Sequence, residues 1–160
     1  MPQILSIVGR SQSGKTTLIE KLIPELKKRG YRIGTIKHAH HGFDIDKSGK
    51  DSWRHRHAGA DVVVVASPGK IAMVKDDDHE SLDDIQNYFE GTDLIITEGY
   101  KKENKPKIEV VRAARHTQLI CLGDHNLIAV VSDVNLNPSV PKFGLNDIKE
   151  LADLIEKKFL

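Results

Sequence analysis

A glycine-rich segment near the N-terminus constrains the fold more strongly than any other feature of this sequence. Residues 9–18, GRSQSGKTTL, contain the pattern GxxxxGKT. The run before it, Gln3 to Val8, is short, apolar and rich in Ile, Leu and Val, as expected of a strand. Apolar residues follow it at helical spacing: Leu18, Ile19, Leu22, Ile23 and Leu26. A strand, a glycine loop and a helix in this order distinguish a phosphate-binding P-loop from a chance match.

The residue types of this segment suit a phosphate anion. Glycines let successive backbone N–H groups turn inward, and the positive end of the following helix favours negative charge. We therefore predict that Lys15 reaches the β- and γ-phosphates as a catalytic residue, and that the Thr16 hydroxyl ligates Mg²⁺. The predicted nucleotide-binding residues of the loop are Gly9, Arg10, Ser11, Gln12, Ser13, Gly14, Lys15, Thr16 and Thr17.

Three further apolar runs indicate the rest of the fold. Asp61 to Ala66, Asp93 to Thr97 and Leu127 to Val131 have the composition of strands that are covered on both faces. Alternation with helices, including an amphipathic closing helix over 148–159, predicts an α/β P-loop NTPase fold with a mostly parallel central sheet flanked by helices. The turn SPG at 67–69 predicts a short hairpin insert reaching 71–74. The length of 160 residues fits one nucleotide-binding domain, 1–160.

Charge and composition exclude several classes of partner. The chain has 24 Lys and Arg against 23 Asp and Glu, without the basic surplus of a general nucleic-acid or membrane binder. No secretory signal and no run of about 18 apolar residues is present. The single cysteine, Cys121, excludes an internal disulfide and suits a reducing compartment. We therefore expect a cytoplasmic protein without nucleic-acid or membrane partners.

Carboxylates at two places can support a nucleotide-bound Mg²⁺, which prefers oxygen ligands. Glu98 ends the apolar strand DLIIT, where it would project at the carboxyl edge of the sheet. It is predicted to order a metal-bound water or to polarise the attacking one. Asp44 and Asp46 alternate on an extended segment and so share a face. One of them is predicted to support the metal, although a solvated loop is the alternative for both.

The segment 37–59, KHAHHGFDIDKSGKDSWRHRHAG, contains five of the eight histidines. His38 and His40, joined by His55 or His57, are candidates for a transition-metal site, and a histidine base is a second interpretation. Interleaved Lys and Arg favour a third, an anion-binding surface for phosphate or pterin, with a solvated loop as the alternative. The predicted contacts are His38, His40, His41, Lys50, Arg54 and Arg56.

Two segments in the second half of the chain are more ambiguous. VVSDVN places Asp133 directly after an apolar strand, where its carboxylate can accept from guanine, although an Asp that begins a turn is equally consistent. GYKKENKPKIEV, residues 99–110, indicates a solvated hairpin tip for most of its lysines, Lys101, Lys102, Lys105 and Lys107. One of them remains a candidate for contact with the γ-phosphate beside Glu98.

Four segments together resemble a known family. GRSQSGKTTL, KHAHHGFDIDKSGKDSWRHRHAGAD, DLIITEGYKKENKPKIEV and AVVSDVNLN occur in this order before the closing helix. They resemble the MobB family of molybdopterin-guanine dinucleotide biosynthesis proteins over nearly the whole chain, and the second segment makes the match specific. One departure is Ser48, where the family more often has Pro.

The resemblance implies a weakly hydrolysing protein that binds GTP and Mg²⁺ and is a homodimer. It implies an accessory role beside the guanylyltransferase MobA, which joins GMP from GTP to molybdopterin, and contacts with molybdopterin and its carrier proteins. Two alternatives remain at this stage. One is a small-molecule P-loop kinase, and the other is a metallochaperone GTPase that carries Ni²⁺ or Zn²⁺ on the histidines.

Overall fold

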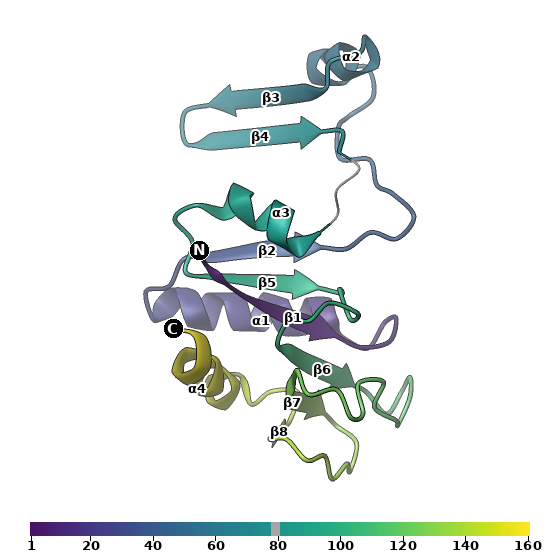
Figure 1. Cartoon of the computed structure of the whole chain (residues 1–160), viewed down its shortest axis with the longest axis vertical. Coiled ribbons are helices and arrows are strands. Elements are labelled where there is room, and N and C mark those ends of the chain that lie inside the picture. Colours follow the sequence, from purple (N-terminus) through teal and green to yellow (C-terminus); the bar gives the residue numbers. More distant parts are fainter. Residues whose placement is uncertain (78–80) are drawn as a thin grey trace. The chain divides into compact units, whose positions relative to one another are not determined.

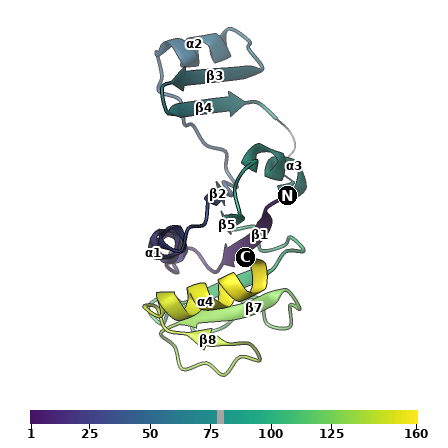
Figure 2. The ribbon, with the colours of Figure 1, turned by 90° about the vertical axis from the view of Figure 1, so that its left-hand side faces the viewer.

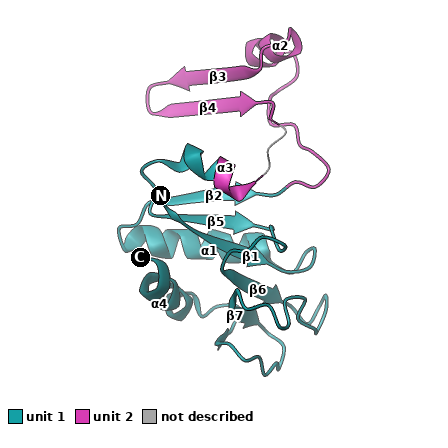
Figure 3. Cartoon of the chain, in the orientation of Figure 1, with its two compact units in different colours: residues 1–38, 85–160 teal, residues 39–84 magenta. Residues whose placement is uncertain are grey.

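The computed structural model describes residues 1–77 and 81–160. The chain divides into two compact units, which Figure 3 distinguishes by colour. The larger unit comprises Met1–His38 and Ile85–Leu160, and the smaller unit comprises Ala39–Asp84. That all 160 residues form one nucleotide-binding domain stays a prediction.

A six-stranded sheet forms the centre of the larger unit (Figure 1). Its order is β2-β5-β1-β6-β7-β8, and every neighbouring pair is parallel. The strands are β1 (Gln3–Val8), β2 (Ile33–Lys37), β5 (Leu94–Glu98), β6 (Lys107–Val111), β7 (Leu127–Ser132) and β8 (Lys142–Phe143). The predicted α/β fold with a mostly parallel central sheet is confirmed.

Two helices cover one face of this sheet. They are α1 (Lys15–Lys28) and α4 (Ile148–Phe159), which contact each other; Figure 2 shows α1 end-on and α4 lengthwise. The shared core contains Leu5 and Ile7 of β1, Leu22 and Leu26 of α1, and Ile155 of α4. The helical spacing of the apolar residues in α1 thus brings one face of the helix into the core.

Loops cover part of the other face. Val8, Val111 and Val130 pack there with Cys121, which lies in the connection between β6 and β7. Burial raises the pKa of the Cys121 thiol to about 11. The thiol is therefore protonated at neutral pH, as expected of an inert core residue.

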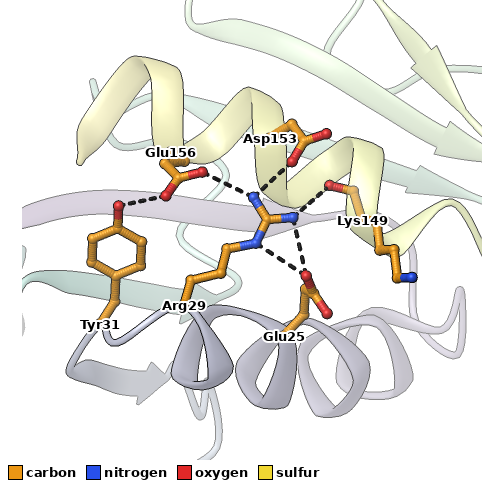
Figure 4. A network of polar contacts seen from close by, with 6 residues as sticks. All are labelled: Glu25, Arg29, Tyr31, Lys149, Asp153 and Glu156. Carbon is orange, nitrogen blue, oxygen red and sulfur yellow. Dashed lines mark hydrogen bonds and ion pairs between the residues drawn. The ribbon is translucent and has the colours of Figure 1, made fainter.

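Arg29 links the C-terminal end of α1 to α4 (Figure 4). Its guanidinium lies 2.7 Å from a carboxylate oxygen of Asp153 and 3.0 Å from one of Glu156, and it donates to the Lys149 carbonyl at 3.2 Å. The Tyr31 hydroxyl donates to the other Glu156 oxygen at 2.6 Å. This network fixes the closing helix against the helix that follows the glycine loop.

The smaller unit contains a helix and a hairpin. They are α2 (Asp51–His57) and the antiparallel pair β3 (Val62–Ser67) and β4 (Lys70–Lys75). The hairpin insert is present, but the prediction that 61–66 is a strand covered on both faces is wrong. Val64 and Val65 point to opposite faces, and both are about half exposed, at 54% and 52%. A run of valines indicates a strand because of side-chain shape, but it does not specify what covers that strand.

A second correction concerns the segment from 99 to 110. Its last residues are not part of a solvated tip, because β6 is a buried inner strand between β1 and β7. The Lys107 side chain is only 2% exposed and donates to the Glu103 carbonyl at 2.7 Å and to Asp124 Oδ2 at 2.8 Å. Charged residues concealed this strand in the sequence, and polar partners make their burial tolerable.

Helix α3 (Leu82–Ile85) continues as a 3₁₀ turn over Gln86–Phe89. The Ser81 hydroxyl accepts from the Asp83 N–H at 3.2 Å and so marks the start of this helix. None of the helices in the described ranges is long and apolar enough to cross a membrane.

Replacing Lys107 tests the buried pair. Lys107→Met removes both Nζ hydrogen bonds and leaves the half-buried Asp124 carboxylate without its cation. The free energy of unfolding should fall by about 2 kcal/mol in urea titrations. Lys101→Met, at an exposed site, is the control and should change it by less than about 0.5 kcal/mol.

The same pair predicts a pH dependence. The hydrogen bond from Lys107 is the main cause that lowers the pKa of Asp124 below its ordinary value of 3.8. Its stabilisation should therefore be complete above pH 3.8 and lost as the pH falls through the folded-state pKa. The difference in the free energy of unfolding between wild type and Lys107→Met should become smaller in that acid range. A difference that does not change with pH would show that the Lys107–Asp124 pair is not its cause.

Candidate functional site

The loop between β1 and α1 has the backbone conformation of a tight phosphate cradle. Gly9 has φ 149°, Gly14 has φ 94°, and Gln12 has the unusual non-glycine value of 59°. The Ser13 N–H donates to the Arg10 carbonyl at 3.2 Å, and the Leu18 N–H donates to the Gly14 carbonyl at 2.9 Å. Helix α1 thus begins directly after Gly14, which places its N-terminal amides at the loop.

Only glycine fits at the start of this loop. A Cβ at Gly9 would lie 2.6 Å from both Ser13 Oγ and the Val110 carbonyl oxygen. That separation is far inside van der Waals contact, so a side chain would push the loop away from β6. The pattern of glycines read from the sequence therefore reflects close packing as well as backbone conformation.

Lys15 folds back over the loop that precedes it. Its ammonium group donates to the Gly9 carbonyl at 3.2 Å and to the Arg10 carbonyl at 2.8 Å. Burial is the main cause that lowers its pKa; the positive charge of Lys37 adds to this, and the carboxylate of Glu98 opposes it. The ammonium group is thus held at the mouth of the cradle by weak carbonyl acceptors that a phosphate can replace.

Thr16 and Glu98 meet although they are 82 positions apart. The Thr16 hydroxyl donates to Glu98 Oε2 at 2.9 Å. Lys37 at the end of β2 lies 3.6 Å from Glu98 Oε1, so the carboxylate has a cation on its other oxygen. A hydroxyl and a carboxylate oxygen in contact are the donor types that Mg²⁺ prefers, so these two residues fit a Mg²⁺ ion.

His38 lies beside this pair. Its N–H donates to the Glu98 carbonyl at 3.1 Å, and its ring stacks on Tyr100 with the centroids 4.4 Å apart. Of the histidines predicted to bind anions, it is the one that belongs to the larger unit.

The other predicted residues of the histidine-rich segment belong to the smaller unit. They are His40, His41, Asp44, Asp46, Lys50, Arg54 and Arg56. Asp46 Oδ1 accepts from the Ser52 hydroxyl at 2.9 Å, and Trp53 stacks on His57 with the centroids 3.6 Å apart. Contacts of these residues with phosphate, pterin or Mg²⁺ stay predictions.

The structure does not support the interpretation of the histidines as a metal site. Across residues 1–77 and 81–160, no three His, Cys, Asp or Glu side chains converge in a way that could hold a metal ion. The metallochaperone alternative therefore stays a prediction without a site in the described part of the chain.

Asp133 lies at an exposed position just after β7. Its Oδ1 accepts from the Ala113 N–H at 2.8 Å, and the neighbouring Ser132 hydroxyl accepts from the Val134 N–H at 2.9 Å. Asp133 thus holds the chain that follows β6, a role that the sequence did not indicate. That the Asp133 carboxylate recognises guanine stays a prediction.

Two residues near the loop were missed by sequence reasoning, Arg112 and His116. Arg112 follows β6 directly, and a Cβ at Gly14 would lie 3.2 Å from its Cδ. Burial and the positive charges of Arg10 and Lys15 lower the pKa of His116, against a smaller opposing effect of Glu109. The signal was the cluster VRAARH after β6, and it was lost because the charged residues of that strand kept it from being recognised.

A cavity of about 270 Å³ adjoins the loop. Ser13, Gly14 and Thr17 line it from the loop side, and Arg112, Val131 and Leu145 are among the residues of its other walls. A larger hollow of about 710 Å³ lies near Met1, Tyr31 and Asp93, at the amino ends of the strands. The smaller cavity adjoins the carboxyl ends of the strands, where ligands of open parallel sheets bind, but its lining does not include Lys15, Thr16 or Glu98.

The fold and the loop together define a P-loop protein of the NTPase class. The chain belongs to the MobB family: the family model described as molybdopterin guanine dinucleotide synthesis protein B matches residues 4–133. The family to which the sequence segments pointed is thus confirmed.

Individual relatives agree with this assignment over nearly the whole chain. The molybdopterin-guanine dinucleotide biosynthesis adapter protein of Escherichia coli is 42% identical over 97% of this chain and 92% of its own. The protein of the same name from Haemophilus influenzae is 40% identical over 96% and 87%. The crystal structure of Bacillus subtilis MobB superposes with a TM-score of 0.81 at 29% identity, covering 99% of this chain and 98% of that one.

The close approach at Gly9 leads to a specific prediction. Gly9→Ala should lower the affinity for a Mg²⁺-bound purine triphosphate by on the order of tenfold or more, because the displaced loop loses amide contacts to phosphate. Gly30→Ala is a matched control, since Gly30 also has positive φ, 98°, but has no atom within 4 Å of an added Cβ. Gly30→Ala should lower the free energy of unfolding, and calorimetric titrations should show an unchanged affinity for the triphosphate. Equal affinities of the two variants would contradict the assigned cradle.

Proposed function

We propose that this protein binds GTP with Mg²⁺ at residues 9–17 and acts as a cytoplasmic adapter in the biosynthesis of molybdopterin guanine dinucleotide. Family membership and the names of its two relatives support the pathway. The observation that carries the nucleotide site is the contact of Thr16 with Glu98 at 2.9 Å, beside a lysine that already points over the loop. An ordinary glycine turn would not need this arrangement.

Each part of the site has a task in this proposal. The inward N–H groups of the loop and the start of α1 hold phosphate oxygens, and Lys15 exchanges its carbonyl acceptors for the β- and γ-phosphates. Thr16 and Glu98 would hold Mg²⁺, which supplies charge neutralisation on the phosphates when bound. Asp44 or Asp46 is proposed to support the metal.

Hydrolysis by the isolated protein is proposed to be slow. Phosphoryl transfer depends on positioned charge and on an oriented water. In this proposal a partner or a second subunit would have to complete the positioning of the attacking water. A MobA-like guanylyltransferase is the proposed partner, and the protein would present nucleotide or molybdopterin to it.

The basic residues of the smaller unit are proposed to bind the phosphate of the pterin precursor or of the nucleotide. Arg54 is exposed on α2, and the last turn of that helix contains Arg54, His55, Arg56 and His57. A dense cationic surface of this kind attracts phosphate anions.

The fate of a labelled γ-phosphate tests the adapter role against the kinase alternative. GTP labelled at that phosphate should release inorganic phosphate slowly, and release should change when a MobA-like enzyme loaded with molybdopterin is added. Stoichiometric transfer of the label to a pterin or to another small molecule would establish a kinase instead.

The choice of base depends in this proposal on Asp133. Asp133→Asn keeps an oxygen that can accept from the Ala113 N–H, but the NH₂ group that replaces the second carboxylate oxygen cannot accept from guanine. Affinity for GTP should therefore fall by on the order of tenfold while affinity for ATP stays unchanged. Competition titrations measure both, and equal losses would remove Asp133 as the base reader.

The protein is also proposed to be a homodimer, joined through the β3–β4 hairpin. The register places Val64 opposite Met73 and Ala66 opposite Ile71, so these residues share one face with Val62. Four large apolar side chains of that face are between 45% and 74% exposed: Val62, Val64, Ile71 and Met73. A two-stranded hairpin is marginally stable in water, and a second copy of the same face would cover these side chains.

A charge on that face should dissociate the dimer. Val64→Lys places an ammonium group in the proposed interface, so sedimentation velocity at micromolar concentration should show a monomer where the wild type is a dimer. Val65→Lys is the matched control, because Val65 is the next residue of the same strand and points to the opposite face. Dissociation of both variants, or of neither, would exclude this face as the interface.

A further inference from the structure

We propose that Arg112 and His116 bind phosphate oxygens of the nucleotide from the side of the loop opposite to Glu98. This inference rests on the proposed nucleotide site and adds two contact residues to it. Neither belongs to the GxxxxGKT loop, and both lie in the connection that follows β6.

Sheet topology places this connection next to the loop. In the order β5-β1-β6 the three parallel strands end at the same edge, with the end of β1 between the other two. The loop continues β1, Glu98 ends β5, and Arg112 comes directly after the last residue of β6. The site thus has an acidic metal side and an opposite side formed by the connection after β6.

Arg112 lies against the end of the loop. Atoms Cδ and Nη1 would be 3.2 Å and 3.8 Å from a Cβ at Gly14, so the side chain extends along that glycine. Arg112 also lines the cavity that Ser13, Gly14 and Thr17 line. Among the described residues its Nε is buried without a hydrogen-bond partner, as is Ser13 Oγ. Buried donors are nearly always paired, so an acceptor from a ligand is the expected partner.

His116 interacts electrostatically with Arg10, at the start of the loop. Both of its ring nitrogens are buried and have no partner within the described ranges. The charged groups that act on it are Arg10 and Lys15 of the loop and Glu109 of β6. Without a ligand, burial and the two cations favour the neutral imidazole. A phosphate would supply an acceptor and favour the protonated form.

Both residues are positioned before any ligand arrives. The N–H groups of Arg115 and His116 donate to the Arg112 carbonyl, each at 2.9 Å, and form a turn. Asp133 fixes the Ala113 N–H, as described above. The fully buried Glu109 carboxylate accepts from the N–H groups of Ile120 and Cys121 at 2.7 and 2.9 Å. Because this connection is held at both ends, it loses less conformational entropy when a ligand binds.

Charge provides the physical reason for this arrangement. A triphosphate brings several negative charges to the cradle, and a guanidinium with planar donors matches phosphate geometry. Arg112 would contact the phosphate near the end of the loop, and His116 the phosphates near Arg10 and Lys15. Together they would balance the charge that Lys15 and Mg²⁺ leave uncompensated.

The first test compares three variants by calorimetric titration with Mg²⁺ and GTP. Arg112→Gln should lower the affinity at least about tenfold, because a charge-assisted contact is lost. Arg115→Gln is the matched control, since Arg115 is an exposed arginine of the same turn, and it should stay within about twofold of wild type. Arg112→Lys keeps a cation without the planar donors and should have intermediate affinity. Circular dichroism melts establish that each variant is folded.

The second test measures the protons taken up on binding. Titration in buffers of different ionisation enthalpy at pH 7 should show uptake by the wild type, because the pKa of His116 rises when phosphate binds. His116→Gln should show less uptake at the same pH, and its affinity should increase less as the pH falls. Protonation of GTP itself is common to both proteins and cancels in the comparison.

The outcomes separate this inference from the proposed function. If the wild type binds GTP and Arg112→Gln and His116→Gln bind it equally well, with unchanged proton uptake, the inference is wrong and the nucleotide site remains. If the wild type binds neither GTP nor ATP, both proposals fail. If Arg115→Gln lowers the affinity for GTP as much as Arg112→Gln does, the inference is also wrong. Such a result would mean that any positive charge in this turn attracts the nucleotide.

Discussion

The parallel pairing of β1 with β5 on one side and β6 on the other is the constraint on which the site depends. Ile7 lies opposite Glu98 in the first pair and Val8 lies opposite Glu109 in the second, so three chain segments end at one edge. Residues that are far apart in sequence thereby meet around the loop at Gly9. The apolar core beneath the sheet and the Arg29 network that fixes α4 to α1 keep this edge in place. A change of register by one residue would turn Glu98 to the other face and separate it from Thr16.

The two compact units have different physical characters. The larger unit buries a continuous core between its sheet and the helices α1 and α4. The smaller unit has only Val63 buried among the valines of β3, and it exposes apolar side chains beside a basic helix. A partner would bury more apolar surface of such a segment than the segment buries by its own packing. This supports a division in which the larger unit binds nucleotide and the smaller unit provides contacts to other molecules.

Sequence reasoning predicted the local structure that carries the candidate site. The loop, helix α1 and the position of Glu98 at a strand end follow from local patterns, because spacing and strand polarity determine them. It did not identify Arg112 and His116, the residues of our further proposal, since their position becomes clear only when β6 is recognised as an inner strand. The charges of Lys107 and Glu109 concealed that strand, and two of their partners, Asp124 and Cys121, lie more than ten residues further along the chain. The valines of β3 show the opposite failure: they predicted a strand correctly and its burial wrongly.

Calorimetric titration of the intact protein with GTP, in the presence of Mg²⁺, tests the central claim most directly. The account predicts binding of about one GTP per chain, which is abolished in a folded Lys15→Ala variant and weakened when Mg²⁺ is removed. Lys15→Ala with the affinity of the wild type, or a wild type that gives no heat with any purine triphosphate, would contradict it.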